Sequence, residues 1–159
     1  MKFSSVFNLL PYKTAYAHCD IPCGIYDPHQ AQVAAHTIIR MTQFLEEIKR
    51  ENETKAEHDI ARVTFVKEEH SNILEHEIAT LEKDYFKEEH YEKFSNLREL
   101  FSSANKLVAK ARQGIDMASA KELLETVMQI SEIFYKSKDL EFKRVKAPYP
   151  TGLDIVVQA

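Results

Sequence analysis

The stretch DPHQAQVAAHTIIRMTQFLEEIKRE, residues 27–51, has the pattern of a long amphipathic helix. Asp27 is a good N-cap residue, Pro28 suits the first helical position, and Gln30 can complete a capping box. Apolar residues then recur in alternating steps of four and three, at Ala34, Ile38, Met41, Leu45 and Ile48. The pattern therefore predicts a first helix that runs to about Glu51 and buries one face.

Three later segments repeat this periodicity. Thr54 and Glu57 form a second capping box, and the helix after them presents Ile60, Val63, Leu74, Ile78, Leu81 and Tyr85 to one side. We expect a break near residues 86–90, because an unbroken helix to Gly114 would exceed the usual length. A third helix shows Phe94, Leu97, Phe101, Ala104, Val108 and Ala111 and closes at Gly114; a fourth, capped by Asp116 or Ser119, shows Leu123, Val127, Ile130 and Phe134.

Four amphipathic helices joined by short loops predict an all-α fold, an antiparallel four-helix bundle over residues 27–146. Glycine and proline are scarce, at 3 and 5 of 159 residues, which favours long helices over a sandwich or barrel. Residues 147–159, with Pro148, Pro150 and Gly152, are expected to form a non-helical C-terminal tail. Its apolar stretch from Leu153 to Val157 could dock elsewhere, for example on a neighbouring subunit.

Composition also limits the partners. The net charge of −4 argues against nucleic acid or an anionic membrane surface as a partner. No uninterrupted apolar run approaches the ~18 residues that a membrane-spanning helix needs. The chain is expected to be one globular domain without a nucleic-acid or membrane partner.

The segment HCDIPCGIY, residues 18–26, precedes the first helix and holds both cysteines of the chain. Pro22 can fold the backbone tightly before Cys23, and Gly24 permits geometries that a Cβ resists, so the Cys19 and Cys23 thiolates can converge. A Cys-x3-Cys pair of this kind can be a small disulfide loop, a redox pair or a metal site. Spacing alone does not choose among them.

Residues 1–17, before this segment, can be an undocked terminus, a poor secretory signal or a pro-segment. If the last is correct, His18 becomes the N-terminus and offers its α-amine and imidazole. The His18 amine and the Cys19 amide would supply two nitrogens, and the two thiolates would supply two sulfurs, in one plane. That donor set suits Ni(II) or Cu(II), whereas zinc prefers a closed tetrahedron. The His18 imidazole would be left as an axial ligand.

The nine residues resemble the His-Cys-x-x-Pro-Cys-x-x-Tyr signature of nickel superoxide dismutases at every fixed position. The similarity continues through Asp27-Pro28 and into a second short block, Asp84-Tyr85-Phe86-Lys87. It implies that residues 1–17 are removed by a protease and that residues 18–26 form a nickel hook. One nickel per subunit would be held by His18, Cys19 and Cys23. Of the other implied site residues, Tyr26 and Tyr85 would flank the metal, Lys87 would attract an anion, and protons would arrive near Asp20 and Tyr26.

The resemblance further implies the activity: disproportionation of superoxide to O2 and hydrogen peroxide by Ni(III)/Ni(II) cycling. It implies a homo-hexamer, and we expect a cytoplasmic enzyme. Two alternatives remain: a helical bundle that binds nickel or copper for storage or sensing without turnover, and a thiol–disulfide switch. An electron spin signal of nickel(III) together with catalysis would distinguish the enzyme from the metal carrier.

Rival sites on the helices find little support. A di-iron bundle needs Glu-x-x-His pairs, and the residues three before His58, His70, His76 and His90 are Lys, Lys, Ile and Lys. The resemblance also implies two residues around the hook imidazole, because many family members have an Arg and a Glu that hydrogen-bond it. The aligned positions in this chain are His70 and Ala34. We expect the other helical histidines at the surface or at helix ends: His29, His36, His58, His76 and His90.

Overall fold

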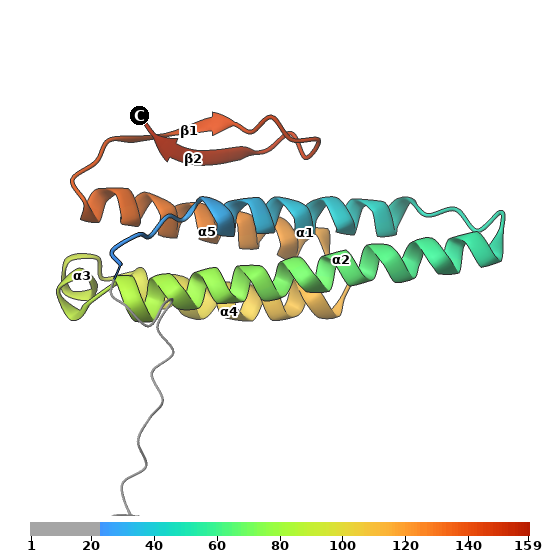
Figure 1. Ribbon diagram of the computed structural model, residues 1–159, viewed down its shortest axis with the longest axis horizontal. Helices are drawn as coiled ribbons and strands as arrows, with labels where there is room; N and C mark the ends of the chain where they lie inside the picture. The colour runs from blue at the N-terminus through green and yellow to red at the C-terminus, as the bar shows by residue number, and fades with distance from the viewer. Residues whose placement is uncertain (1–22) are drawn as a thin grey trace, which may run out of the picture.

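The computed structural model describes residues 23–159 (Figure 1). The expectations for residues 1–17, His18, Cys19 and Asp20 lie outside this part of the chain. The described elements, in order, are helices α1 (His29–Glu47) and α2 (Glu53–Thr80), a π-helical turn η1 (Leu81–Tyr85), helices α3 (Glu88–Lys93), α4 (Leu97–Gln113) and α5 (Met117–Ser137), and strands β1 (Phe142–Lys146) and β2 (Asp154–Gln158).

The four long helices form an antiparallel bundle, which confirms the predicted fold class. Helix α1 packs against α2 and α5, and α4 packs against the same two helices from the other side (Figure 1). The core is built from the apolar stripes that the sequence shows, with Ile38, Leu74, Phe101, Val108, Leu123 and Ile130 all at most 1% exposed. Periodic burial of these side chains, more than helix propensity, fixes the arrangement.

Several helix ends differ from the prediction. Helix α1 ends at Glu47 instead of about Glu51, because Ile48 is already extended, with ψ 121°. Asp27 accepts a hydrogen bond from the His29 backbone N–H at 2.7 Å, but Pro28 precedes the helix instead of opening it. The Thr54–Glu57 capping box is wrong: the Asn52 side chain caps α2 by accepting from the backbone N–H of Lys55 at 3.0 Å.

The later boundaries agree better with the prediction. The expected break is present, at Phe86 and Lys87, although the short helix α3 that follows was not predicted. Gly114 follows α4, and Asp116 caps α5 by accepting from the backbone N–H of Ser119 at 3.0 Å.

No helix between residues 23 and 159 is long and apolar enough to cross a membrane.

The C-terminal region is a β-hairpin, an element that the sequence did not predict. Strands β1 and β2 pair antiparallel with Val145 opposite Ile155, and β2 packs against α5 and α1 (Figure 1). Ile155 and Val156 are buried. The apolar stretch of the tail therefore docks on its own bundle.

Two polar side chains of α1 hold the hairpin. The Gln32 amide donates to the Val156 carbonyl at 3.0 Å and accepts from the Val156 N–H at 2.7 Å, as a neighbouring strand would. His36 Nε2 lies 3.2 Å from the Asp154 carbonyl and Nδ1 lies 2.7 Å from Thr151 Oγ1. Since a carbonyl only accepts, Nε2 carries the proton and Nδ1 accepts from Thr151. The expectation that His36 lies at the surface or at a helix end is wrong: it is buried within α1.

Candidate metal centre

The part of the hook that the structure describes is a short turn anchored on the bundle. Cys23 and Gly24 are exposed, and Gly24 has φ +71°, a left-handed conformation that favours glycine. Among the described residues, apart from its chain neighbours, no atom lies within 4 Å of where a Gly24 Cβ would be. The left-handed backbone, and not crowding by those residues, therefore favours glycine there. Tyr26 packs on the core two residues later. The Cys23 sulfur is therefore presented to solvent close to a fixed aromatic anchor.

The aromatic anchor is a pair of tyrosines from the two sequence blocks. The ring centroids of Tyr26 and Tyr85 are 5.4 Å apart, although 59 positions separate the residues. Tyr85 ends the π-helical turn, which closes with a hydrogen bond from the Phe86 N–H to the Leu81 carbonyl at 2.9 Å. Such turns shift a side chain relative to a regular helix and are frequent at functional sites. The structure thus brings the two tyrosines together, and their roles in catalysis stay a prediction.

The Tyr85 hydroxyl is tied to the end of α5. It lies 2.6 Å from Ser137 Oγ, and the Ser137 hydroxyl donates to the Phe134 carbonyl at 2.7 Å. Because serine has one hydroxyl proton, Tyr85 donates and Ser137 accepts. The Tyr85 ring also packs on Phe134, with centroids 4.7 Å apart. Burial raises the pKa of Tyr85 above its ordinary value of 10.0, so its phenol resists ionisation at alkaline pH as well as at neutral pH.

Basic groups surround this tyrosine. Lys87 is exposed and its ammonium donates to the Asp84 carbonyl at 2.7 Å, which holds the charge beside the second block. His90 stacks on the Tyr85 ring with centroids 5.7 Å apart. Lys138 Nζ lies 5.3 Å from the Tyr85 centroid and 4.9 Å from that of Phe134. The end of the bundle that anchors the hook therefore carries two lysine cations near Tyr85, one from the second block and one from the end of α5.

Sequence reasoning did not single out Ser137, Lys138 or His90. Ser137 and Lys138 follow the predicted core residue Phe134 by three and four positions, so helical periodicity places them on its face. That signal could have identified them as neighbours of Phe134. It could not show that Tyr85, from another helix, packs on the same ring.

His70 and Ala34, the positions where the resemblance implies an Arg and a Glu, lie on the facing helices α2 and α1. His70 is half-buried on α2 and its Nδ1–H donates to the Val66 carbonyl at 2.9 Å, a contact within its own helix. It precedes Tyr85 by roughly 20 Å of helix at the usual rise per residue. Ala34 is fully buried. Neither residue contributes a ligand to the part of the site that the structure describes.

The donors available within residues 23–159 do not complete a metal site. No group of three or more His, Cys, Asp or Glu side chains in that range could hold an ion. Cys23 provides one soft sulfur donor, which is exposed and follows Cys19 and His18 closely in the sequence. A thiolate in this setting fits nickel as one ligand of a larger set.

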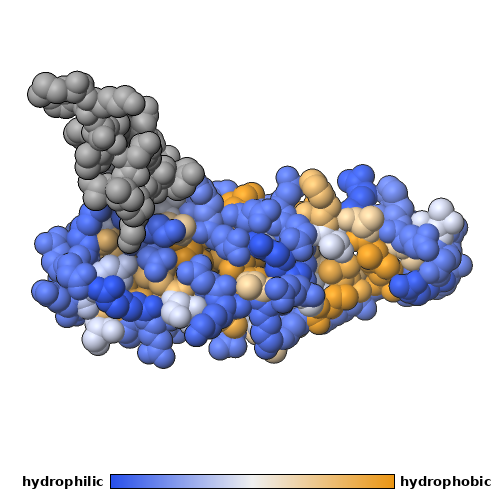
Figure 2. Space-filling view, turned by 90° about the horizontal axis from the view of Figure 1, so that it is seen from below, coloured by the Kyte–Doolittle hydropathy of each residue, from blue (hydrophilic) through white to orange (hydrophobic). Residues whose placement is uncertain are grey.

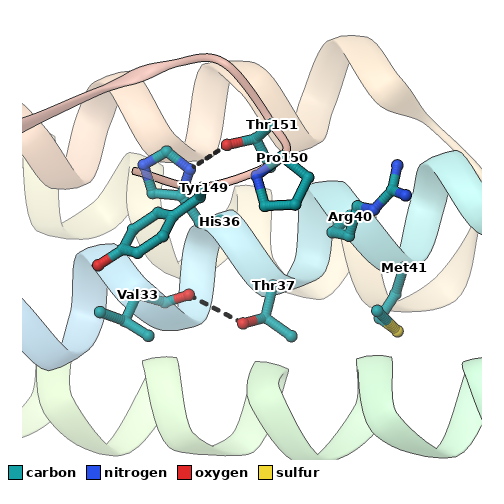
Figure 3. A pocket seen from close by; sticks show the side chains of 8 residues that line it. All are labelled: Val33, His36, Thr37, Arg40, Met41, Tyr149, Pro150 and Thr151. Atoms are coloured by element: carbon teal, nitrogen blue, oxygen red, sulfur yellow. Dashed lines mark hydrogen bonds between the residues drawn. The ribbon is translucent and has the colours of Figure 1, made fainter. Parts of the chain in front are cut away.

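A separate cavity of about 200 Å³ lies between α1 and the hairpin turn (Figure 3). It is lined by Val33, His36, Thr37, Arg40, Met41, Tyr149, Pro150 and Thr151. At the wall of this cavity, His36 contacts Thr151 and Tyr149 directly and docks the hairpin turn on α1. Its lining shares no residue with the tyrosine pair or with Cys23.

Comparison with known proteins identifies the family. Residues 13–138 match the profile described as nickel-containing superoxide dismutase. Superoxide dismutase [Ni] of Streptomyces coelicolor is 34% identical over 128 residues, which cover 80% of this chain and 93% of the relative. Superoxide dismutase [Ni] of Streptomyces seoulensis is 34% identical over 122 residues, covering 77% and 88%.

Solved structures agree with this match. Native nickel superoxide dismutase superposes with a TM-score of 0.68 at 31% identity, covering 76% of this chain and 99% of the other. The structure with nickel ligation corresponding to the oxidised state gives 0.69 at 31% identity, covering 77% and 99%. The family profile ends at residue 138, before strand β1, so the hairpin lies beyond it. The chain belongs to the family of nickel-containing superoxide dismutases.

Proposed function

We propose that this chain converts superoxide to O2 and hydrogen peroxide with one nickel ion per subunit, held by the hook of residues 18–26. As a member of the family, the chain is a nickel-dependent superoxide dismutase. The assignment of the site residues is supported by the contact between Tyr26 and Tyr85, whose ring centroids are 5.4 Å apart. These two tyrosines come from the two sequence blocks that resemble the family.

The proposed ligands are the amine and imidazole of His18, the amide nitrogen and thiolate of Cys19, and the thiolate of Cys23. Nickel bound by these donors supplies one-electron redox chemistry between the +3 and +2 states. The amine ligand does not exist while His18 is in a peptide bond with Ala17. A protease that removes residues 1–17 is therefore part of the proposal.

The remaining residues act on the substrate and on protons. Tyr26 and Tyr85 limit access to the hook and orient superoxide, and the Tyr85 hydroxyl is held by its hydrogen bond to Ser137. Lys87 attracts the anion, as a cation near a site on an acidic protein would. Backbone groups near Asp20 and water deliver the protons that peroxide requires.

The test compares protein that begins at His18 with protein that begins at Ala17. We expect stoichiometric nickel and superoxide consumption only for the first, because one extra residue converts the amine ligand into an amide. Cys23→Ser should abolish both activity and the nickel(III) spin signal. Activity in Cys23→Ser would contradict the mechanism. Tight nickel binding without turnover would favour the storage or sensing alternative, and a Cys19–Cys23 disulfide without a metal requirement would favour the redox switch.

We also propose assembly into a homo-hexamer. The support is apolar surface where α2 extends past α4 (Figures 1 and 2). Phe65 is 63% exposed and Phe44 is 37% exposed, and Phe44 lines a groove with Ile48 and Val63. Exposed apolar surface of this kind often marks a protein interface. Sedimentation should give six subunits, and Phe44→Ser with Phe65→Ser should lower that number; an active monomer would contradict the assembly.

The proposed location is the cytoplasm. Among residues 23–159, no helix is able to span a membrane. Fractionation of source cells, with the mass of the recovered chain, would report location and leader cleavage together.

A further inference from the structure

Lys138 places a positive charge directly on the aromatic pair that anchors the hook. It caps the C-terminal end of α5, and its side chain is exposed. Its ammonium lies 5.3 Å from the centroid of Tyr85, whose other ring neighbours include Tyr26 at 5.4 Å. Tyr85 thus contacts Tyr26, the last residue of the hook, and also lies under the ammonium group of Lys138 from the end of α5.

Within residues 23–159, no acidic side chain forms an ion pair with Lys138, whereas Arg98 pairs with Glu88 and Arg144 pairs with both Glu125 and Glu132. Its contacts are the faces of Tyr85 and Phe134, which attract a cation but carry no net charge. A full unit of positive charge therefore remains available to an approaching anion.

The distances put this charge within electrostatic reach of the tyrosine pair. The Debye length is about 10 Å at 0.1 M ionic strength, longer than the separation between the ammonium and the Tyr85 ring. Superoxide is an anion, and the chain as a whole is acidic, with a net charge of −4. A local cation at the point of approach counteracts that repulsion and raises the association rate.

We propose that Lys138 is a steering residue that concentrates superoxide at the Tyr26–Tyr85 pair, in addition to Lys87. The proposal rests on the proposed dismutase function of the hook. The Lys138 ammonium lies over the rings of Tyr85 and Phe134 and supplies no nickel ligand in the proposal, so it acts on the rate of encounter and leaves the chemical steps unchanged.

The chain offers a matched control for this residue. Lys136 is also exposed, lies two positions away on the same helix, and places its ammonium 5.3 Å from the centroid of Phe142 in the hairpin. Lys136→Gln therefore makes the same change in net charge and removes a comparable cation–π contact, but away from Tyr85. Lys138→Arg keeps the charge while changing the side chain.

The first measurement is the second-order rate constant for superoxide consumption by mature nickel-loaded protein at increasing ionic strength. Lys138→Gln should lower it about two- to threefold at low salt. The loss should vanish near ~1 M salt, where the Debye length is about 3 Å. Lys138→Arg should retain the wild-type rate, and Lys136→Gln should change it little. Equal losses in Lys138→Gln and Lys136→Gln, or a loss that persists at high salt, would overturn the proposal.

A second measurement needs no nickel. The chain has no tryptophan, so its emission comes from tyrosine, and the difference from a Tyr85→Phe background reports Tyr85. Iodide, an anionic quencher, should quench this emission less in metal-free Lys138→Gln than in Lys136→Gln, while neutral acrylamide quenches both alike. Equal iodide quenching would count against Lys138 as an anion guide. Absence of turnover in the wild-type protein would instead defeat the dismutase function, and the two failures are thereby distinguished.

Discussion

The hydroxyl groups of Tyr85 and Ser137 form a single chain of hydrogen bonds that ends on the Phe134 carbonyl. This arrangement joins the π-helical turn to the last turn of α5, at the base of the hook. Because Ser137 has one proton to donate, its oxygen is the acceptor that fixes the Tyr85 phenol. The position of Tyr85 therefore depends on a residue from a distant part of the sequence.

A double-mutant cycle tests this coupling. Ser137→Ala and Tyr85→Phe should each lower the free energy of unfolding by about 1 kcal/mol, and the double variant should lose less than the sum. Ser131→Ala is the control, since Ser131 donates to the Val127 carbonyl within the same helix at 2.8 Å and contacts no tyrosine hydroxyl. Urea unfolding of the metal-free protein measures all of these values. Additive losses for Ser137 and Tyr85 would show that the hydroxyls are not coupled.

The sequence predicts that Tyr26 and Tyr85 belong to one site, but it does not predict their neighbours on α5. The pairing of Tyr26 with Tyr85 follows from the family blocks, because both positions belong to them. Lys138 and Ser137 do not follow, because their relevance arises from the packing of α5 against the π-helical turn. Helical periodicity places residues on a face, but it does not say which side chain of another helix meets that face.

Among the elements, the contact of α1 with strand β2 is the most specific. Gln32 is fully buried and its amide both donates to and accepts from the Val156 backbone. Gln32→Glu should lower the free energy of unfolding by about 3 kcal/mol, because it removes the donor and buries a carboxylate against a carbonyl. The exposed Gln30 provides the control: Gln30→Glu should change stability by less than about 0.5 kcal/mol in the same urea titration. A small loss for Gln32→Glu would mean that the hairpin detaches at little cost.

His36 makes the contact between α1 and strand β2 sensitive to pH. Burial lowers its pKa below the ordinary value of 6.5, although the Asp154 carbonyl partly opposes the shift. The docked hairpin therefore favours the neutral imidazole, and its stability is complete above about pH 6.5 and declines as the pH falls below that value. Hydrogen-exchange protection of the β2 amides should be lower at about pH 5.5 than at about pH 7.5. His36→Gln should reduce this dependence, whereas His76→Gln, at an exposed position, should leave it intact.

The contacts that stabilise the hairpin explain why the sequence did not predict it. Strand β1, FKRVK, carries three basic residues and lacks a clear alternation of apolar and polar positions. Arg144 nevertheless reaches Glu125 and Glu132 of α5, and Phe142 stacks on Tyr135. The strand is stabilised by these tertiary contacts and by Gln32, which lies 124 positions before Val156. Local sequence patterns do not contain such information.

For the whole molecule, the bundle was predictable because each long helix carries a continuous apolar stripe. Those stripes fix the number of long helices and the antiparallel order of neighbours joined by short loops. The unequal lengths were harder to foresee: α2 runs from Glu53 to Thr80 and continues into η1, whereas α4 spans Leu97–Gln113. The extra length leaves the α1–α2 pair projecting past α4, with Phe65 exposed (Figure 1).

Removal of the hairpin tests how far the bundle is independent of it. A chain that ends at Glu141 keeps all the helices and the residues matched by the family profile, but loses the burial of Ile155 and Val156. Since burying an aliphatic side chain contributes about 1.5–3 kcal/mol, and ordering the hairpin costs entropy, we expect a loss of at most about 5 kcal/mol. Circular dichroism should show undiminished helix content with a lower urea midpoint.

The same truncation separates stability from function. The tyrosine pair, Ser137 and Lys138 all remain in the shortened chain, so nickel binding and the salt dependence of superoxide consumption should be kept at low temperature. Gln32 and His36 become exposed to water in this chain, so Gln32→Glu should then cost less than in the full-length protein. An unchanged cost would mean that Gln32 stabilises the bundle itself. Loss of helix content on truncation would show that the hairpin is part of the folding unit.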